Sequence, residues 1–335
     1  MTSYKTKTCP VGIDNYSLHP LDLSPEETLD WAVENGCEGA AFSGLTPDQY
    51  AELSVERLKD LSARAGDQGL YLEWGGGRHI PCDMETWEKM DIFSTNLERA
   101  REAAAMGVEI IRSCSGGLMR WQADSPPTQE LMRITAEALK KQRGMLADHG
   151  VILAIETHFE FTSFELLRIF EMAGLEPGAE VGICLDTMNL LVMLEDPSAA
   201  ADRLLPWTVS THIKDGGLLL DEAGLHPFPV EVGSGIVDLP EIIKKIASLD
   251  RTVNLSVEDH GGSFDLPVFD QTFLAEFPDL TTGEMTGLMY LALDTKGKLE
   301  RKDLNITSRK QWPHICSRRV KTDIVQLKKI AQQFR

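Results

Sequence analysis

The 335-residue chain has no run of 18 apolar residues, and its first residues contain no apolar segment of signal-peptide length. These absences argue against a membrane-spanning helix and against secretion, so we expect a cytoplasmic protein. The six cysteines, at positions 9, 37, 82, 114, 184 and 316, include no CxxC pair. The sequence therefore predicts neither a zinc knuckle nor a disulfide framework, and most of these cysteines should be buried thiols.

Basic residues are also scarce. The chain has 33 Lys and Arg against 52 Asp and Glu, a formal net charge of −19. Nucleic-acid binding needs clustered basic residues, so nucleic acid is not an expected partner. The one basic segment, residues 317–335, has the pattern of a terminal amphipathic helix with a solvated face. What the chain does have is 42% hydrophobic residues, enough for a sizeable globular core.

Short apolar runs alternate with longer helical patterns along the sequence. Each helical pattern has recognisable signals; the first has Ser24 as N-cap, Pro25 as its first residue and Gly36 as its stop. Strict alternation in eight units predicts an α/β fold, a (β/α)8 TIM barrel over residues 9–265. The eight strand-like runs are residues 11–17, 39–44, 70–77, 109–117, 151–158, 181–189, 209–215 and 253–261.

A doubly wound open sheet is the alternative, because the same local units build it. That fold usually has a glycine-rich phosphate turn after its first strand, and residues 13–22 contain none. After residue 265 the alternation ends. We expect a partly helical C-terminal extension, residues 266–335, with a short hairpin around residues 293–300. The extension would wrap the barrel or form a homo-oligomer contact.

Successive residues of a strand point to opposite faces, which sorts the side chains of the last four runs. In each run one face is mostly Leu or β-branched, and the other is small or polar. In the seventh run, Val209 would face the outer helices, while His212 and Lys214 would face into the barrel. The inward faces end in residues that should meet at the barrel mouth: Glu156, Asp186, His212 and Glu258.

Three carboxylates and one imidazole cannot converge cheaply without a cation, because like charges a few ångströms apart repel. Taken singly, a carboxylate at a strand end is usually a helix cap, and a single histidine is usually structural. Four such residues in matching phase favour one divalent metal ion instead. The oxygen-rich set suits Mn²⁺ or Mg²⁺ best, with Co²⁺ or Zn²⁺ as alternatives.

Five motifs then carry a family resemblance: AIETH (154–158), CLDTMN (184–189), THIKDG (211–216), VGSGIVDLPEIIKKI (232–246) and SVEDHGG (256–262). Together they resemble the xylose isomerase-like barrel superfamily, a group of sugar isomerases and epimerases, over roughly residues 9–262. The resemblance implies that Glu156, Asp186, His212 and Glu258 hold the metal and that Glu156 and Glu258 form an acid/base pair.

The implied reaction is isomerisation or epimerisation of a keto-sugar or related α-hydroxy ketone. A metal holding two substrate oxygens would stabilise an enediolate while the glutamates transfer the proton. A third catalytic candidate is His158, which would bind a substrate hydroxyl or protonate a leaving group, unless it is a packed structural histidine. The substrate-binding candidates are Lys214, Asn189, Trp74 and Arg112, with His79 and His260 also near the mouth.

Three other functions compete with this interpretation. A metal-dependent lyase, either a dehydratase or an enzyme of β-elimination from a 3-keto sugar derivative, would use the same scaffold with His158 as the acid. A three-zinc apurinic endonuclease would need additional histidines, yet Asn189 stands where one is expected. A barrel that only binds its ligand would not need the complete set of four metal-binding side chains.

Overall fold

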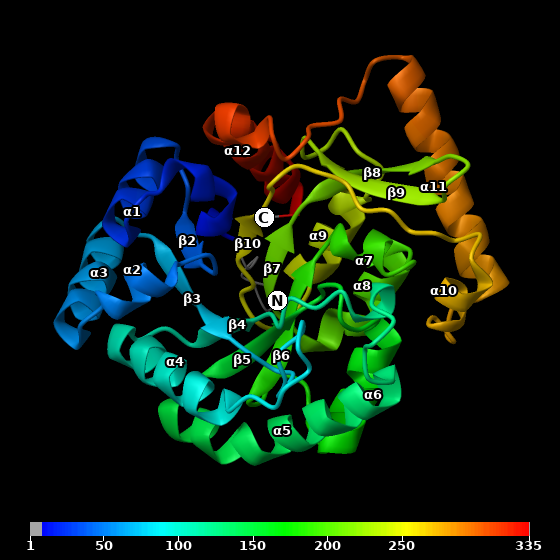
Figure 1. Cartoon of the computed structure of the whole chain (residues 1–335). Helices are drawn as coiled ribbons and strands as arrows, with labels where there is room; N and C mark the ends of the chain where they lie inside the picture. Colours follow the sequence, from blue (N-terminus) through cyan, green and yellow to red (C-terminus); the bar gives the residue numbers. More distant parts are fainter. Residues whose placement is uncertain (1–8, 335) are drawn as a thin grey trace, which may run out of the picture.

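The structure is a computed structural model that describes residues 9–334. Eight parallel strands close into a barrel in the spatial order β1-β10-β7-β6-β5-β4-β3-β2, and helices surround it (Figure 1), which confirms the predicted (β/α)8 fold. The barrel strands are β1 (Val11–Asp14), β2 (Gly39–Phe42), β3 (Tyr71–Gly77), β4 (Ile110–Ser113), β5 (Ile152–Glu156), β6 (Val181–Asp186), β7 (Thr208–Ile213) and β10 (Leu255–Val257).

The helices form the outer layer of the molecule (Figure 1), and no helix within residues 9–334 is long and apolar enough to cross a bilayer. They are α1 (Pro25–Glu34), α2 (Pro47–Ala51), α3 (Val55–Asp67), α4 (Ile92–Met106), α5 (Thr128–His149), α6 (Ser163–Ala173), α7 (Asn189–Val192), α8 (Pro197–Leu204), α9 (Leu239–Ala247), α10 (Gln271–Ala275), α11 (Thr282–Glu300) and α12 (Trp312–Ala331). Short 3-10 turns are η1 (Asn15–Leu21), η2 (Met119–Trp121), η3 (Leu205–Trp207) and η4 (Gln332–Phe334).

Local signals set the helix ends. Helix α1 begins as predicted, with Ser24 as N-cap in a capping box and Pro25 in the first turn. Helices α4, α5 and α6 each end at a glycine with left-handed backbone, Gly107, Gly150 and Gly174, at φ 68°, 65° and 64°. A residue with a Cβ is strained there, so glycine terminates each of these helices.

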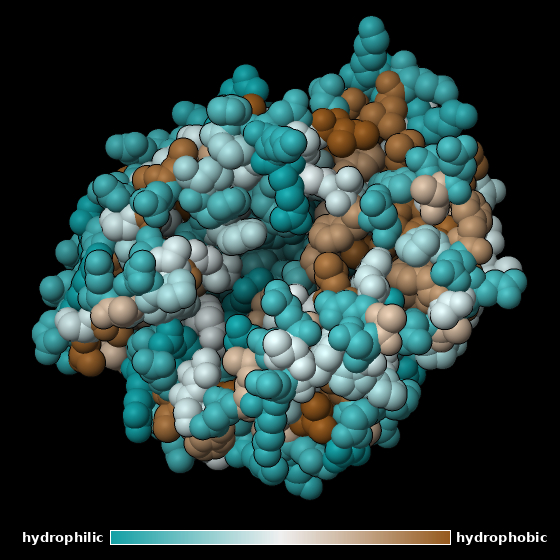
Figure 2. Space-filling view, in the orientation of Figure 1, coloured by the Kyte–Doolittle hydropathy of each residue, from teal (hydrophilic) through white to brown (hydrophobic). Residues whose placement is uncertain are grey.

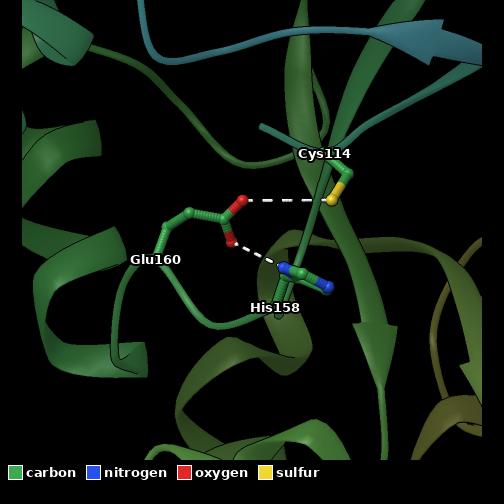
Figure 3. Close-up of side chains that lie close together, drawn as sticks. All are labelled: Cys114, His158 and Glu160. Atoms are coloured by element: carbon green, nitrogen blue, oxygen red, sulfur yellow. Dashed lines mark hydrogen bonds and ion pairs between the residues drawn. The ribbon is translucent and has the colours of Figure 1, made fainter. Parts of the chain in front are cut away.

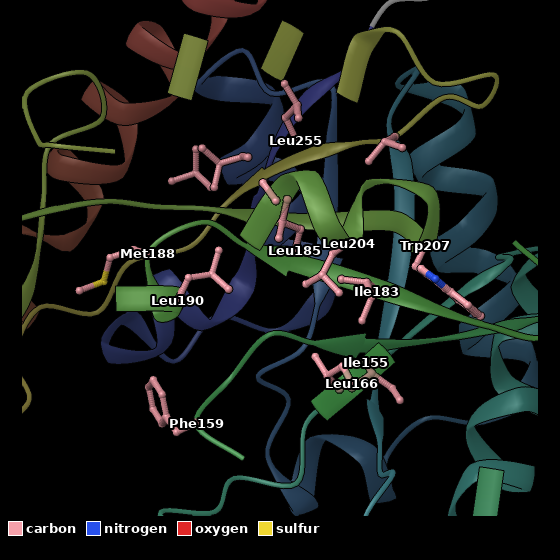
Figure 4. Close-up of a cluster of buried hydrophobic side chains, with 14 of the residues drawn as sticks. Ile155, Phe159, Leu166, Ile183, Leu185, Met188, Leu190, Leu204, Trp207 and Leu255 are labelled. Atoms are coloured by element: carbon pink, nitrogen blue, oxygen red, sulfur yellow. The ribbon is translucent and has the colours of Figure 1, made fainter. Parts of the chain in front are cut away.

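The main apolar core lies between the strands and the outer helices (Figure 4). Ile155 of β5 and Ile183 of β6 are fully buried there, as is Leu204 of α8. Each such side chain contributes roughly 1.5–3 kcal/mol when it is removed from water. The outward faces predicted for β5 and β6 therefore supply the packing that holds the sheet against its helices.

The lower part of the barrel interior contains a buried carboxylate. Glu73 of β3 accepts hydrogen bonds from the hydroxyl of Ser210 and from Nδ2 of Asn254 at 2.7 Å. Burial is the main cause that raises the pKa of Glu73 to about 7, although both hydrogen bonds act in the opposite direction. The polar inward residues expected on β7 and in the eighth run thus meet a partner from across the barrel.

Val209 departs from the predicted phase. The pairing of β6 with β7 shifts register at this point. Ile183 pairs with Thr208 and Cys184 pairs with Ser210, so Val209 has no partner on β6 and forms a β-bulge. A Cβ on Gly182 would lie only 2.7 Å from the Val209 side chain, so Val209 packs inside the barrel. The predicted outward orientation of Val209 is wrong, because a bulge breaks the alternation on which it depended.

The C-terminal part differs more from expectation. The predicted hairpin around residues 293–300 is wrong: helix α11 runs through that segment from a capping box at Thr281 and Glu284. The real hairpin comes earlier, as β8 (Asp215–Leu220) and β9 (Leu225–Val230), and it lies beside α11 at the edge of the barrel (Figure 1). The Thr295 hydroxyl accepts a hydrogen bond from the backbone N–H of Leu218, which helps to dock the helix on the hairpin.

Helix α12 is the predicted amphipathic terminal helix. It packs against η1, β1 and α9, with Val320 and Leu327 fully buried, and so belongs to the ring of helices around the barrel. Residue 335, the last of the basic segment, lies outside the described residues. No disulfide links the six cysteines, of which five are buried and Cys114 is partly exposed, as the spacing predicted.

Because the pKa of Glu73 is raised in the folded state, the stability of the protein should depend on pH. The folded state holds this proton up to about pH 7, whereas a solvated glutamate loses it near pH 4.5, so ionising Glu73 costs stability as pH rises through that window. We expect Glu73→Gln to match the wild type at pH 5 and to be about 2–3 kcal/mol more stable at pH 8. Urea unfolding at both pH values measures the difference in free energy of unfolding between the variant and the wild type, with exposed Glu222→Gln as the control. The same difference at pH 5 and at pH 8 would contradict the prediction.

Candidate active site and metal centre

Four polar side chains meet at the carboxyl end of the barrel. Their ligand atoms all lie within 4.8 Å of one another, and all four residues are buried. They come from β5, β6, β7 and the residue directly after β10, which are consecutive strands in the barrel. The structure therefore brings together the four side chains for which the sequence predicted a metal: Glu156, Asp186, His212 and Glu258.

Hydroxyl groups tie the strand ends to one another. Thr157 Oγ1 donates to the carbonyl oxygen of Asp186 at 3.0 Å and accepts from its N–H at 2.8 Å. Thr187 makes the same kind of double link with Lys214 on the following strand. These bonds align β5, β6 and β7 just where the ligand side chains leave the sheet, which limits how far Glu156, Asp186 and His212 can move apart.

Two cations of the chain lie among the carboxylates. Arg112 forms an ion pair with Glu156. Lys214 forms an ion pair with Glu258 and places Nζ 3.1 Å from Asp186 Oδ2. The converging carboxylates need positive charge to offset their repulsion, and these two side chains supply part of it.

A further carboxylate completes the charge count. Asp14 Oδ2, at the end of β1, lies 3.4 Å from His212 Nε2. With it, four carboxylates face two cations, Arg112 and Lys214.

Burial opposes the charge on His212, but Cys184, Glu156 and Asp14 outweigh it and hold the pKa of His212 well above its usual range. A metal ion would displace that proton, because a metal-binding imidazole is neutral, and would then face two negative charges. One divalent cation would neutralise them.

The donor atoms fit such an ion. Glu156 Oε2, Asp186 Oδ2 and His212 Nδ1 are buried and make no hydrogen bond within residues 9–334. Ion pairs with Arg112 and Lys214 already compensate the first two atoms in part, and His212 Nδ1 lies 3.4 Å from Glu156 Oε1. Buried polar atoms without hydrogen bonds are costly, and a cation would satisfy them. Asp14 beside the second nitrogen of His212 resembles the carboxylates that orient metal-bound histidines. Sequence reasoning missed Asp14, whose signal was an acid closing the first apolar run.

The two glutamates are ionised at neutral pH. Burial opposes the charge on Glu156, but Arg112 and His212 outweigh it and hold its pKa well below the usual range. For Glu258, burial is likewise outweighed, chiefly by Lys214 and then by His260, and its pKa falls to about 2. Both carboxylates are therefore available as anionic ligands.

A cavity of about 410 Å³ opens over these residues, and Figure 2 shows a hydrophilic hollow over the barrel. A second cavity, of about 600 Å³, lies at the opposite end of the barrel, beside Ile110 and Val209 and far from the metal-binding side chains. The lining of the 410 Å³ cavity is Tyr16, Ser43, Gly44, Leu45, Arg112, Cys114, Gly116, Glu156, His158, Phe159, Asn189, Lys214, Glu258, His260 and Arg309.

The predicted catalytic and substrate-binding residues line this cavity, except Trp74 and His79. Glu73 points into the barrel, so Trp74, the next residue along β3, points outward and donates a hydrogen bond from Nε1 to Glu102 at 2.8 Å. His79 is buried beside Ser113, with Nδ1 at 3.0 Å from its hydroxyl. Neither ring lines the cavity, so neither is placed to contact a substrate there.

Asn189 is placed to act on a metal-binding side chain. It opens α7, and its Nδ2 lies 3.3 Å from Glu156 Oε1. Asp186 Oδ1 accepts the backbone N–H of Asn189 at 2.9 Å. The asparagine therefore joins two of the four candidate ligands and still faces the cavity.

His158 belongs to a second cluster, with Glu160 and Cys114 (Figure 3). Glu160 Oε2 lies 3.1 Å from His158 Nδ1, and Glu160 Oε1 accepts the backbone N–H of Ser115 at 3.0 Å. The glycine-rich turn after β4 thus fixes the carboxylate, and the carboxylate orients the imidazole, whose other nitrogen points away from Glu160 (Figure 3).

The same cluster sets the charge of His158. Burial opposes protonation, but Cys114 and Glu160 outweigh it and hold the pKa of His158 well above the usual range. A protonated, oriented imidazole at a cavity wall is suited to general acid catalysis. Glu160 was not predicted; its spacing of two residues from His158 in ETHFE was the available signal.

The comparisons with known proteins agree with this architecture. A family model described as xylose isomerase-like TIM barrel matches residues 29–273. A 3-oxo-isoapionate decarboxylase from Pectobacterium atrosepticum is 27% identical over 266 residues, which cover 74% of this chain and 84% of that protein.

Solved structures share the fold. An L-ribulose 3-epimerase superposes with a TM-score of 0.56 at 19% identity, covering 88% of this chain and 95% of its own. A xylose isomerase-like TIM barrel protein from Mycobacterium smegmatis in complex with magnesium superposes with a TM-score of 0.58 at 18% identity, covering 85% and 100%.

The geometry predicts one divalent ion per chain. We expect Asp186→Asn to lower Mn²⁺ affinity by about 100-fold or more, because it removes an anionic ligand from a buried set. Calorimetric titration of the metal-free protein with Mn²⁺ measures it. Cys114→Ser is the matched control, since it alters the second cluster alone and should retain one ion per chain; an unchanged affinity of Asp186→Asn would contradict the assignment.

Proposed function

This chain belongs to the xylose isomerase-like TIM barrel family, and we propose that it is a divalent-metal-dependent isomerase or epimerase of a keto-sugar or related α-hydroxy ketone. One observation carries the proposal: three carboxylates and an imidazole converge at the mouth of the barrel beside a cavity. Barrel enzymes of this architecture keep their catalytic groups at this end.

Glu156, Asp186, His212 and Glu258 would hold the metal ion. When bound, the ion supplies Lewis-acid polarisation of the substrate carbonyl, which makes the hydrogen on the neighbouring carbon acidic. Mn²⁺ and Mg²⁺ are favoured by the oxygen-rich donor set, while Co²⁺ and Zn²⁺ suit it less well. Proteins with the same fold have been solved with magnesium and with zinc, so this choice rests on the donor set alone.

The residues of the chain then move the proton. Glu156 and Glu258 stand on strands separated by β6 and β7, so they approach a ligand in the cavity from two sides. One glutamate removes a proton from carbon and the other returns it. Return to the same carbon inverts that centre, and return to the neighbouring carbon moves the carbonyl.

The cations would orient the substrate oxygens. Arg112 and Lys214 both line the cavity and reach the carboxylates beneath it. A substrate oxygen that carries developing negative charge would find these donors already in place, which lowers the barrier without reorganisation. Asn189 would hold Glu156 in the orientation it needs to reach the substrate carbon.

A lyase is the second candidate, and the pair of His158 and Glu160 favours it. Elimination needs an acid at the leaving group, and His158 is oriented and protonated at the cavity wall. The 27% identical relative is a decarboxylase, in which a carbon–carbon bond breaks. In such a reaction CO₂ leaves, the electron pair moves towards the carbonyl, and a proton is delivered to the carbon that lost the carboxylate.

Isomerase chemistry predicts isotope exchange. The Mn²⁺-loaded protein in D₂O should incorporate deuterium into a ketose at the carbon next to the carbonyl, without loss of water or CO₂. Glu258→Gln should slow this exchange by roughly 10²–10⁴-fold, because it removes a proton-transfer group. NMR spectra recorded over a panel of ketoses give the rate.

Glu73→Gln is the matched control, since Glu73 is a buried barrel carboxylate that does not line the cavity. It should exchange at the wild-type rate. Wild-type deuterium exchange in Glu258→Gln would contradict the assignment of Glu258 as a proton-transfer group.

Lyase chemistry makes a different prediction for His158. If the substrate loses CO₂ or water, His158→Gln should slow release of that product by roughly 10²-fold while Mn²⁺ binding stays unchanged. Product formation followed by NMR, with Mn²⁺ titration of the same variant, measures both. Wild-type release from His158→Gln would exclude the histidine as the acid.

A further inference from the structure

The C-terminal segment contributes a residue to the cavity. Arg309 lies between α11 and α12 and lines the cavity together with Lys214, Glu258 and His260. It stands beyond residue 273, where the match to the family model ends. A cation at the mouth therefore comes from outside the part of the chain that carries the family pattern.

The segment around Arg309 is anchored to the barrel on both sides. On one side, the N–H of Gly262, in the loop after β10, donates to the carbonyl oxygen of Thr307 at 2.8 Å. On the other, Trp312 Nε1 donates to the carbonyl oxygen of Ser17 at 3.1 Å, with the indole fully buried. Arg309 thus sits on a short span whose two ends are fixed against the mouth.

The Arg309 side chain packs against Phe264 and Gly262. Its guanidinium lies 6.0 Å from the centre of the Phe264 ring, a cation–π arrangement. A Cβ on Gly262 would come 2.7 Å from Arg309 Cγ, so glycine leaves room for the arginine stem. Phe264 packs on Phe159 at 4.4 Å between ring centres, and Phe159 lines the cavity wall.

Arg309 lacks a counter-charge of its own. Within residues 9–334 no carboxylate lies in ion-pair distance of it, whereas the other two cations of the cavity are paired: Arg112 with Glu156 and Lys214 with Glu258. With a divalent ion bound, the carboxylates at the metal centre and these two cations balance. Arg309 is then the unbalanced positive charge of the lining, held at the rim, where it is exposed to solvent.

We propose that Arg309 binds an anionic group of the substrate, a carboxylate or a phosphate, at the end of the molecule remote from its reacting carbonyl. This rests on the proposed function, which places the keto group at the metal centre. Guanidinium presents a planar pair of donors that matches either anion. The substrate class is then a keto-sugar acid or keto-sugar phosphate, selected over the neutral sugar by a residue of the C-terminal segment.

Three ligands that differ at one carbon test the proposal. L-sorbose, 5-keto-D-gluconate and L-sorbose 6-phosphate share the keto group and its neighbouring hydroxyls, and carry a hydroxymethyl, a carboxylate or a phosphate group at the far end. Calorimetric titration of each into the Mn²⁺-loaded full chain gives its affinity. We expect at least one of the two anionic ligands to bind ten times more tightly than L-sorbose or better, and the tighter one identifies the native group.

Variants assign the preference to Arg309. Arg309→Met should weaken binding of the preferred anion about tenfold and leave L-sorbose binding unchanged, and Arg309→Lys should restore part of the loss. Lys310→Met is the matched control, because Lys310 is an exposed cation on the same segment that does not line the cavity. It should bind all three ligands as the wild type does.

The outcomes separate this inference from the function beneath it. Equal affinity for the neutral and anionic ligands, or an anion preference that survives in Arg309→Met, overturns the anion site and leaves the proposed reaction standing. Binding of none of the three ligands by the metal-loaded protein overturns the keto-sugar substrate class and the anion site together. Loss of L-sorbose binding in Arg309→Met would show a general structural role and also overturn the proposal.

Discussion

Three buried carboxylates and an imidazole converge at the end of this barrel, with ligand atoms that all lie within 4.8 Å of one another, and the rest of the site follows from that constraint. Glu156, Asp186, His212 and Glu258 come from four neighbouring strand ends, so closing the barrel brings them together, and Asp14 at the end of β1 lies beside His212. Burial alone would protonate such a set. Arg112 and Lys214 form ion pairs with these carboxylates, and one divalent ion bound beside a neutral His212 would balance the charge that remains when Asp14 is counted.

Different structural elements around the site position different groups of residues. The paired threonine hydroxyls align the strand ends, and the turn after β4 holds Glu160, which in turn orients His158. The C-terminal segment closes one side of the mouth with Arg309. Backbone hydrogen bonds or buried packing hold each of these elements in place, which suits a site that must keep its groups in a fixed geometry.

The barrel and the convergence of its ligands could be predicted because both depend on short periods in the sequence. The β/α alternation and the period of two within strands placed Glu156, Asp186 and His212 on the inner face, and the motifs indicated the family, which the comparisons confirm. Val209 shows where periodicity fails, since a bulge is set by pairing with β6. The prediction that Trp74 lines the mouth is wrong, because Glu73 faces the barrel interior and the next residue of the strand therefore faces outward.

Other features depend on tertiary contacts that no local pattern records. Helix α11 continues through Gly297 because it docks on the β8–β9 hairpin, which the sequence did not suggest. Asp14 and Arg309 reach the site from the two ends of the chain, some 295 residues apart. A cytoplasmic location and a homo-oligomer formed through the extension remain predictions, as do the individual roles of the metal-binding side chains.

The most direct test of the central claim is the position of the metal ion itself. Crystals of the chain grown with Mn²⁺ and measured at the manganese absorption edge should show one anomalous peak per chain. It should lie about 2.0–2.6 Å from donor atoms of Glu156, Asp186, His212 and Glu258. A peak at Cys114, His158 and Glu160 instead, or no peak at the four ligands in saturating Mn²⁺, would contradict the account.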